Sequence, residues 1–256
     1  MTMNPFDLSG RVAIVTGGNG GIGLGMARGL ARAGARIVVA GRNAAKNQAA
    51  VAELETLGPG AIGIEVDLSR EDDCRSLVAR GVEAFGRLDI LINNAGIALR
   101  KPPQDYTSAE WHRVLDTNLT SAFLCSHAAY PHMKAAGGGK IVSIGSILSL
   151  MGASFAVAYA ASKGGLVQMT RALATAWAAD NIQVNAILPG WIDTDLTRSA
   201  RVEVDGLDAR VRSRTPCGRW GTPNDFEAIA VLLGGPGSQF ITGAAIPVDG
   251  GYTIQA

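Results

Sequence analysis

Apolar residues recur along the chain in short runs that are hydrophobic at consecutive positions, without the alternation typical of a half-exposed strand. Runs of this kind, bounded by turn-forming residues, indicate strands that are buried on both faces. The pattern predicts strands at residues 11–16, 36–41, 61–66, 89–93, 140–145, 183–188 and 244–248. We therefore expect a sheet that is covered by other elements on both sides.

Longer segments with a helical spacing of apolar positions separate these runs. They predict helices at about 21–33, 44–57, 70–85, 108–135, 157–179 and 224–233. Strict alternation of strand and helix predicts parallel strands joined by right-handed crossovers. We expect an α/β fold in which residues 1–256 form one Rossmann-type domain, a doubly wound parallel sheet of about seven strands with helices on both faces. Residues 193–222 interrupt the alternation, and their length and polarity favour a mobile lid.

Composition and charge narrow the range of partners. The chain has 256 residues, 47% of them hydrophobic, which suits one domain with a sizeable core. A net charge of +1 gives no electrostatic reason to expect nucleic acid or a membrane surface as partner, and no apolar run is long enough to span a bilayer. Cys74, Cys125 and Cys217 are odd in number and widely spaced, so buried reduced thiols and a cytoplasmic location are expected.

A glycine-rich turn joins the first predicted strand to the first predicted helix. Its sequence, TGGNGGIG, satisfies both G-x-G-x-x-G and T-G-x-x-x-G-x-G. Such a turn avoids Cβ clashes and aims backbone N–H groups at a pyrophosphate, at the positive end of a helix. The order of strand, turn and helix favours a dinucleotide site over a plain surface turn. The candidate cofactor-binding residues here are Thr16, Gly17, Gly18, Asn19, Gly20, Gly21, Ile22 and Gly23.

The end of the second strand bears on the choice of cofactor. Proteins that bind NAD usually place an acidic side chain there to accept a hydrogen bond from the ribose 2′-hydroxyl. This chain has Gly41, Arg42 and Asn43 instead, with no carboxylate before Glu53. Because a guanidinium pairs with a 2′-phosphate, Arg42 predicts NADP, with NAD as the alternative. Asn43, the next residue, is a further candidate contact of the cofactor. Arg42 also fits an ordinary solvated residue at the start of a helix.

A serine, a tyrosine and a lysine follow the fifth strand at a spacing that suggests catalysis. Ser146 comes directly after the strand, and Tyr159 and Lys163 lie four residues apart on one face of a helix. A neighbouring ammonium lowers the pKa of a phenol toward the range of a general acid or base. A serine hydroxyl stabilises charge that develops on a substrate oxygen. Taken alone, the tyrosine and lysine would be two ordinary residues of an amphipathic helix.

Together with NNAG at 93–96, Asn118 and PGWIDT at 189–194, these motifs resemble the short-chain dehydrogenase/reductase family over essentially the whole chain. The resemblance implies hydride transfer between a nicotinamide and a secondary alcohol or ketone. It implies that Ser146, Tyr159 and Lys163 are catalytic, that the lysine also holds the nicotinamide ribose, and that Asn118 anchors a proton-relaying water. It adds cofactor contacts at Asp67, Leu68, Asn94, Ala95, Gly96, Pro189, Gly190, Ile192 and Thr194.

Some of these assignments have structural alternatives or depart from the family. Asp67 also fits an N-cap of the next helix, and residues 93–96 also fit the end of a strand. Many relatives that use NADP carry a basic residue within the glycine loop, where this chain has Asn19 and Gly20. Gly145 stands where relatives often have a further serine, which leaves the Ser146 hydroxyl in place.

The substrate pocket is expected near residues 97–101, 148–155 and 191–198. The segments NNAGIALRKP and RTPCGRWGTP resemble the sugar-acid branch of the family, the gluconate 5-dehydrogenases and 2-deoxygluconate 3-dehydrogenases. Arg100 or Arg198 would bind the carboxylate of such a substrate. The candidate pocket also contains apolar residues, namely Met151, Phe155, Trp191 and Leu196. These residues equally suit a 3-oxoacyl thioester or an apolar ketone.

Two further classes of function are disfavoured by the sequence. A cofactor-binding scaffold without catalysis is disfavoured by the intact serine, tyrosine and lysine. A metal enzyme is not expected, because the three histidines, His112, His127 and His132, do not share one helix face at ligand spacing.

The two longest predicted helices, 108–135 and 157–179, are rich in alanine, leucine and other apolar residues beyond one face. A second apolar stripe of this kind would be buried by pairing with a second copy of the chain across a two-fold axis. The resemblance adds contacts of residues 244–256 around a second axis, which implies a homotetramer. The alternative is a monomer whose extra apolar residues are small alanines on the surface.

Overall fold

Seven parallel strands form one sheet in the order β3-β2-β1-β4-β5-β6-β7 in the computed structural model, which describes residues 4–255. Each predicted strand is present, with its ends shifted by one residue at most. The strands are β1 (Val12–Thr16), β2 (Arg36–Gly41), β3 (Ala61–Glu65), β4 (Ile90–Asn93), β5 (Gly139–Ile144), β6 (Ile182–Pro189) and β7 (Ala245–Val248). Residues 1–3 and 256 of the expected domain lie outside the described part.

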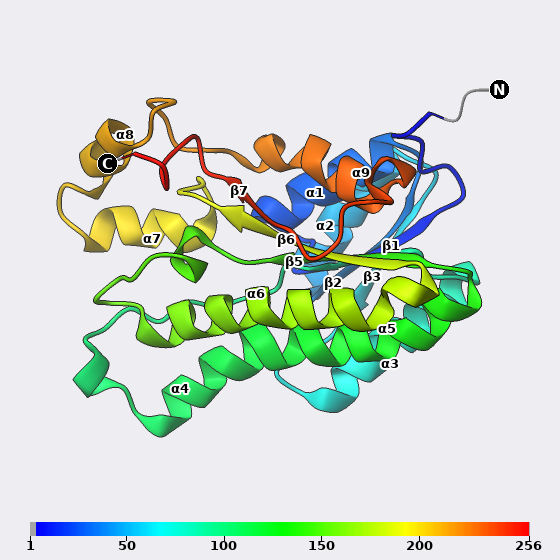
Figure 1. Cartoon of the computed structure of the whole chain (residues 1–256), viewed down its shortest axis with the longest axis horizontal. Helices are drawn as coiled ribbons and strands as arrows, with labels where there is room; N and C mark the ends of the chain where they lie inside the picture. Colours follow the sequence, from blue (N-terminus) through cyan, green and yellow to red (C-terminus); the bar gives the residue numbers. More distant parts are fainter. Residues whose placement is uncertain (1–3, 256) are drawn as a thin grey trace.

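Helices cover both faces of the sheet, as predicted. Figure 1 shows α1, α2 and α9 above the sheet and α3, α5 and α6 below it. The helices are α1 (Gly21–Arg32), α2 (Ala44–Glu55), α3 (Glu71–Phe85), α4 (Ser108–Leu115), α5 (Ser121–Ala135), α6 (Val157–Trp177), α7 (Asp195–Glu203), α8 (Leu207–Arg214) and α9 (Glu227–Gly234). Short 3₁₀ turns lie at Pro103–Asp105, Ile147–Ser149, Ala178–Asp180, Pro223–Phe226 and Pro236–Ser238.

Two segments differ from the prediction. The expected helix 108–135 is two helices, α4 and α5, joined by a π-helical turn at Asp116–Thr120. Residues 193–222, expected to interrupt the alternation, contain the short helices α7 and α8. Their sequences are rich in charged residues, so the apolar periodicity that reveals a helix is weak there.

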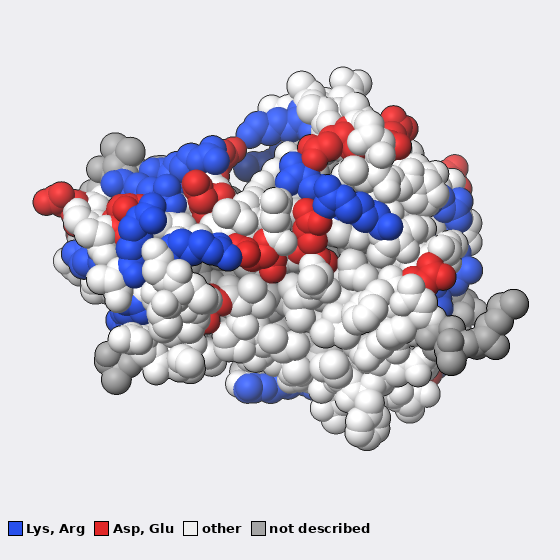
Figure 2. Space-filling view, turned by 90° about the horizontal axis from the view of Figure 1, so that it is seen from above, with Lys and Arg blue, Asp and Glu red and all other residues white. Residues whose placement is uncertain are grey.

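Charges on the surface are mixed in sign. On the face seen in Figure 2, lysine and arginine side chains lie among aspartate and glutamate side chains and do not form one large basic patch. Within residues 4–255, no helix combines the length and the apolar character that crossing a membrane requires. In the same residues, no group of three or more His, Cys, Asp or Glu side chains is arranged to hold a metal ion.

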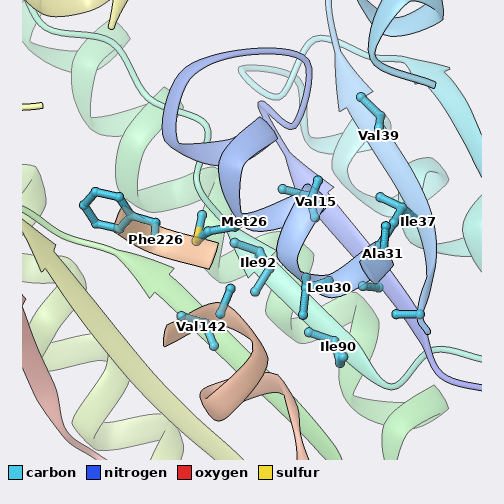
Figure 3. Packing of buried hydrophobic residues seen from close by; sticks show 14 of the residues in the cluster. Val15, Met26, Leu30, Ala31, Ile37, Val39, Ile90, Ile92, Val142 and Phe226 are labelled. Atoms are coloured by element: carbon cyan, nitrogen blue, oxygen red, sulfur yellow. The ribbon is translucent and has the colours of Figure 1, made fainter. Parts of the chain in front are cut away.

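The core has two layers, one on each side of the sheet, because successive strand residues point to opposite faces. In β1, Ala13 and Val15 pack under α1 and α9, whereas Val12 and Ile14 pack against α3 and α5. Figure 3 shows the first layer, in which Val15 lies among side chains from the helices and neighbouring strands. Each fully buried aliphatic side chain contributes about 1.5–3 kcal/mol to folding, so the central strands anchor the molecule.

The cysteines only partly follow the prediction. Cys74 and Cys125 are buried thiols in the core layer below the sheet, as expected. Cys217 is exposed, because it lies in the loop that follows α8. All three are free thiols.

Candidate active site

The carboxyl ends of the parallel strands meet at one edge of the sheet, and the loops that follow them enclose a cavity of about 290 Å³. Its wall contains the following predicted residues: Gly17, Asn19, Gly20, Gly21, Ile22, Asn94, Ala95, Gly96, Ser146, Tyr159, Lys163, Pro189, Gly190, Ile192 and Thr194. The segment 191–198, expected to line the substrate pocket, also contributes Asp195, Leu196 and Thr197. Sequence reasoning did not assign three others to it: Lys46, Ile144 and Gly145. The fold therefore brings segments from both halves of the sheet to one site.

The glycine turn between β1 and α1 has a backbone that other residues would strain. Gly17 has φ +62° and Gly21 has φ +51°, in the left-handed region that favours glycine. A Cβ at Gly23 would overlap the carbonyl oxygen of Gly17. Because the turn opens directly into the first N–H groups of α1, its shape fits a pyrophosphate.

Thr16 ties this turn to the loop after β4. Its hydroxyl donates to the Ile92 carbonyl at 3.2 Å and accepts from the N–H groups of Asn94 at 2.9 Å and Ala95 at 3.0 Å. The Asn94 amide in turn donates to the Thr16 carbonyl at 2.9 Å. Thr16 thus lies behind the cavity and positions two loops that line it.

Small and neutral groups meet at the end of β2. The Asn19 side-chain nitrogen donates to the Asn47 side-chain oxygen at 2.6 Å, and a Cβ at Gly41 would overlap that same nitrogen. Asn43 caps α2 by accepting from the Lys46 N–H at 2.9 Å. Arg42 is exposed at this strand end. The position that carries an acid in NAD-binding proteins is therefore free of negative charge within its own segment.

Asp67 and Leu68 lie outside the cavity wall. The Asp67 carboxylate accepts from the N–H of Ser69 at 3.1 Å and from its hydroxyl at 2.8 Å. These bonds, helped by the charges of Arg42 and Arg70, hold the pKa of Asp67 below its ordinary value. The N-cap of α3 is Arg70, so the alternative reading of Asp67 as the cap is wrong. Leu68 is buried in the core.

Ser146, Tyr159 and Lys163 converge beyond the end of β5. Ser146 begins a 3₁₀ turn and its hydroxyl accepts from the Leu148 N–H at 3.1 Å. The Ser146 side chain also lies near enough to the Tyr159 phenol to lower its pKa. Lys163, one turn further along α6, is 3% exposed, and its ammonium donates to the Ile144 carbonyl at 2.6 Å. The three side chains thus share one wall of the cavity.

The pKa relation expected between the tyrosine and the lysine is wrong. Burial raises the pKa of Tyr159, whereas the interaction with Ser146 and the charge of Arg100 lower it by a smaller amount. Burial also lowers the pKa of Lys163 to about 8. The Lys163 ammonium faces the Ile144 carbonyl, 5.6 Å from the centre of the tyrosine ring, so it does not act as the principal partner of the phenol.

Asn118 lies in the π-helical turn between α4 and α5, a feature that often marks functional sites. Its side chain accepts from the Ile97 N–H at 2.8 Å and donates to the Ile97 carbonyl and the Ser162 hydroxyl, both at 3.0 Å. The Ser162 hydroxyl donates to the Tyr159 carbonyl at 2.7 Å. Asn118 therefore joins the loop after β4 to the helix that carries the tyrosine.

The segment after β6 closes another side of the cavity. Ile192 pairs with Gly221, and Thr194 begins α7. The Thr197 hydroxyl donates to the Ile192 carbonyl, which folds the first turn of α7 back onto this segment. The helices α7 and α8 share a small apolar cluster, in which Trp191 meets Trp220 edge to face at 5.6 Å.

A second cavity of about 90 Å³ adjoins the first. Ser146 and Tyr159 line both, and the walls of the second also contain the predicted Arg100, Phe155, Trp191 and Leu196. Arg100 donates to the Leu196 carbonyl at 3.0 Å. Met151 instead lines a larger neighbouring cavity of about 540 Å³, together with Phe155, Trp191, Arg210 and Arg214. The predicted Arg198 pairs with Asp193 and Asp195 at the start of α7.

Comparison with known proteins agrees with this geometry. A family model described as enoyl-(acyl carrier protein) reductase matches residues 17–253. The 2-dehydro-3-deoxy-D-gluconate 5-dehydrogenase of Escherichia coli is 40% identical over 256 residues, which cover both chains completely. Two structures superpose closely. One is a Beutenbergia cavernae protein assigned as an NAD(P)-dependent gluconate 5-dehydrogenase, with bound NADP (TM-score 0.93, 38% identity, 98% of this chain and 100% of that one).

The second structure that superposes closely is a 3-oxoacyl (acyl-carrier-protein) reductase of Agrobacterium tumefaciens with NADP bound (TM-score 0.91, 34% identity, 97% of this chain and 96% of that one). Sequence, fold and relatives agree over nearly the full length. The chain belongs to the short-chain dehydrogenase/reductase family of oxidoreductases.

Proposed function

We propose that this chain is an NADP-dependent dehydrogenase that interconverts a secondary alcohol and a ketone on a sugar acid. One observation carries the proposal: Ser146 and Tyr159 line two adjoining cavities. One is the cavity of about 290 Å³ at the glycine turn, called the large cavity below, and the other is the cavity of about 90 Å³ that contains Arg100, called the small cavity. A substrate in the small cavity would place its oxygen at the serine and tyrosine hydroxyls. Its reacting carbon would then face the large cavity.

The cofactor assignment rests on the glycine turn and on the end of β2. The turn keeps its tight shape only with glycine, because Cβ atoms at Gly17 and Gly23 would overlap neighbouring protein atoms, and it leads directly into the N-terminus of α1. Arg42 supplies a cation, and no acid stands at the end of β2 to repel a 2′-phosphate. Two relatives of similar fold were solved with NADP. NAD remains the alternative, since the glycine loop itself carries no basic residue.

Each catalytic side chain has a distinct task in this proposal. When bound, the nicotinamide supplies or accepts the hydride. Tyr159 donates a proton to the substrate oxygen in reduction and removes it in oxidation. Ser146, which lines the same cavity wall as Tyr159, holds that oxygen and stabilises its developing charge. Lys163 provides a buried cation under the cofactor site, and Asn118 positions the tyrosine helix.

The carboxylate of the substrate is assigned to Arg100. This guanidinium lines the small cavity beside Tyr159, close enough that its charge acts on the phenol. Arginine binds carboxylates through paired, charge-assisted hydrogen bonds. A relative that is 40% identical along its whole length acts, by its name, on 2-dehydro-3-deoxy-D-gluconate.

A second candidate is reduction of a 3-oxoacyl thioester. The larger neighbouring cavity, lined by Met151, Phe155 and Trp191, could accept an apolar chain, and one of the structural relatives is a 3-oxoacyl reductase. Its identity of 34% is lower than the 40% of the sugar-acid enzyme, and Arg100 has no evident role with an apolar substrate. The sugar acid is therefore preferred.

The experiment is a turnover assay with NADP(H) against sugar acids, their neutral polyol counterparts, a 3-oxoacyl thioester and simple ketones. We expect the highest kcat/KM for a sugar acid. Arg100→Met should raise the KM for the acid about tenfold or more, through loss of a charge-assisted contact, and should leave the neutral polyol within about twofold. Faster turnover of the thioester, or equal effects of the variant on acid and polyol, would contradict the assignment.

The same proposal covers the assembly and its setting. We propose that the chain acts as one domain in a homotetramer in the cytoplasm. On α5, Phe123 is 45% exposed, and α6 presents mainly small residues outward, among them Ala161, Ala172 and Ala176. The expected leucines and tryptophan of these helices are not exposed, because Leu166 is buried and Trp177 is partly covered by Tyr130. Phe240 and Ile254 near the end of the chain are also exposed.

A further inference from the structure

Lys46 reaches across the mouth of the large cavity. It lies in the first turn of α2, and its ammonium is 3.4 Å from a carboxylate oxygen of Asp195, the first residue of α7. Both side chains line the cavity, and both are well exposed, 61% for Lys46 and 76% for Asp195. The ion pair thus links the half of the site built by β1 and β2 to the segment that follows β6.

Local hydrogen bonds place Lys46 next to the end of β2. Its N–H is the one that Asn43 caps, so it lies one helical turn from Arg42 along the chain. The adjacent residue, Asn47, binds the side chain of Asn19 and the carbonyl of Gly41. The ribose 2′ substituent of a dinucleotide lies at this strand end. Lys46 is therefore within the region that a 2′-phosphate would enter.

A 2′-phosphate at the end of β2 would carry more negative charge than one cation neutralises. A phosphate monoester carries a charge of about −1.5 to −2 at neutral pH. Arg42 is one cation, but its charge already acts on the carboxylate of Asp67. The glycine loop has Asn19, whose amide nitrogen is engaged by Asn47. Lys46 is the further cation that lines the cavity on this side.

We infer that Lys46 is a second binding group for the 2′-phosphate of NADP and that it leaves Asp195 to take this role. The inference rests on the proposed cofactor. The exchange leaves no unpaired carboxylate, because Asp195 also accepts from Arg198 at 3.0 Å. Exposed ion pairs contribute little to stability, whereas a lysine beside a phosphate forms a stronger, charge-assisted contact. Asp195 consequently competes with the cofactor, and binding of NADP uncouples α2 from α7.

The test measures dissociation constants of NADPH and NADH by calorimetry, without turnover, for the wild type, Lys46→Met, Asp195→Asn and the double variant. We expect Lys46→Met to weaken NADPH about tenfold and NADH less than twofold. Asp195→Asn should tighten NADPH about threefold, and the double variant should lose that gain. Lys134→Met is the matched control, since Lys134 is an exposed lysine paired with Asp180 on another face, and it should change neither constant.

The outcomes separate this inference from the proposed function. A wild type that binds NADH more tightly than NADPH overturns the cofactor assignment and the inference with it. A wild type that prefers NADPH, with a preference that survives Lys46→Met, overturns the inference alone. Equal weakening of NADPH and NADH by Lys46→Met places the lysine at the pyrophosphate and overturns the 2′-phosphate contact. An unchanged NADPH constant in Asp195→Asn overturns the competition.

Discussion

A phenol whose pKa is raised stays protonated at neutral pH, and this defines what Tyr159 can do before any substrate arrives. Burial raises its pKa, while the interaction with Ser146 and the charge of Arg100 act in the opposite direction. Tyr159 is therefore ready to donate a proton, which suits reduction of a ketone. In the oxidation direction it must first lose that proton, so the neighbouring cations matter more.

Replacing Tyr159 with phenylalanine should lower kcat by about 100-fold or more, because general acid–base catalysis supplies that much. The dissociation constant of NADPH should stay within about twofold, since the ring and the shape of the cavity are kept. Steady-state rates and calorimetric titration of the same preparation measure both. Tyr130→Phe is the control, because its hydroxyl bonds Asp180 outside the cavity. Turnover retained in Tyr159→Phe would exclude the tyrosine as the acid.

Sequence alone predicted that Tyr159 and Lys163 share one helix face, because a helix places residues four apart on one face whatever surrounds them. Their catalytic role, and that of Ser146, was predicted from the resemblance to the family. The sequence could not predict the pKa shifts of these side chains. The pKa of the tyrosine depends on how deeply α6 packs and on a guanidinium, Arg100, from a different loop. Lys46 was missed for the same reason, since its contact with Asp195 joins positions that lie far apart in the chain.

At the scale of elements, the strands and the helices α1 and α6 at the site were predictable, whereas the helices α7 and α8 were not. The strands are apolar at consecutive positions because both faces are buried, and this pattern is local. The helices α7 and α8 are held by a cluster of Ala200, Leu207, Val211 and Trp220, and Trp220 comes from the segment beyond them. The π-helical turn at Asp116–Thr120 contains neither glycine nor proline, so no residue type in it predicts the interruption of the helix.

The helices α7 and α8 should move as a lid. They connect to the rest of the molecule at the cavity edge, and the pairing of Asp195 with Lys46 is exposed and weak. We expect amide hydrogen exchange of residues 193–214 to be fast in the free protein and to slow on adding NADPH and substrate. Strands β4 and β5 serve as an internal reference, because they lie in the middle of the sheet and most of their residues are buried. Exchange in 193–214 that stays unchanged would exclude a lid.

At the scale of the whole molecule, the parallel order of the strands explains why residues from position 17 to position 197 share one cavity. Every carboxyl end opens at the same edge of the sheet, so the loops after β1, β4, β5 and β6 meet there. The surfaces of α5 and α6 that face away from the sheet do not line this cavity. They remain available for contacts between copies of the chain.

Light scattering at micromolar concentration should give a mass of about four times 26.5 kDa, because isologous pairing would cover the outer faces of α5 and α6 and residues 244–256 would form contacts around a second axis. Phe123→Asp should reduce that mass, since it places a charge in the proposed interface. Phe6→Asp is the matched control, as Phe6 is similarly exposed but lies in the N-terminal segment. A wild-type mass of one chain would refute the interface, and a dimer would restrict it to the helices.

The buried ammonium of Lys163 also ties folding to proton release. Its pKa is about 8 in the folded chain and returns to about 10.4 when the chain unfolds. Between these values unfolding takes up a proton at this side chain, so its unfavourable contribution to the free energy of folding shrinks as pH rises, by up to about 1.4 kcal/mol per pH unit. Below pH 8 both states are protonated and the full cost of burying the charge remains. The lysine proposed for catalysis therefore opposes folding most strongly in the neutral range.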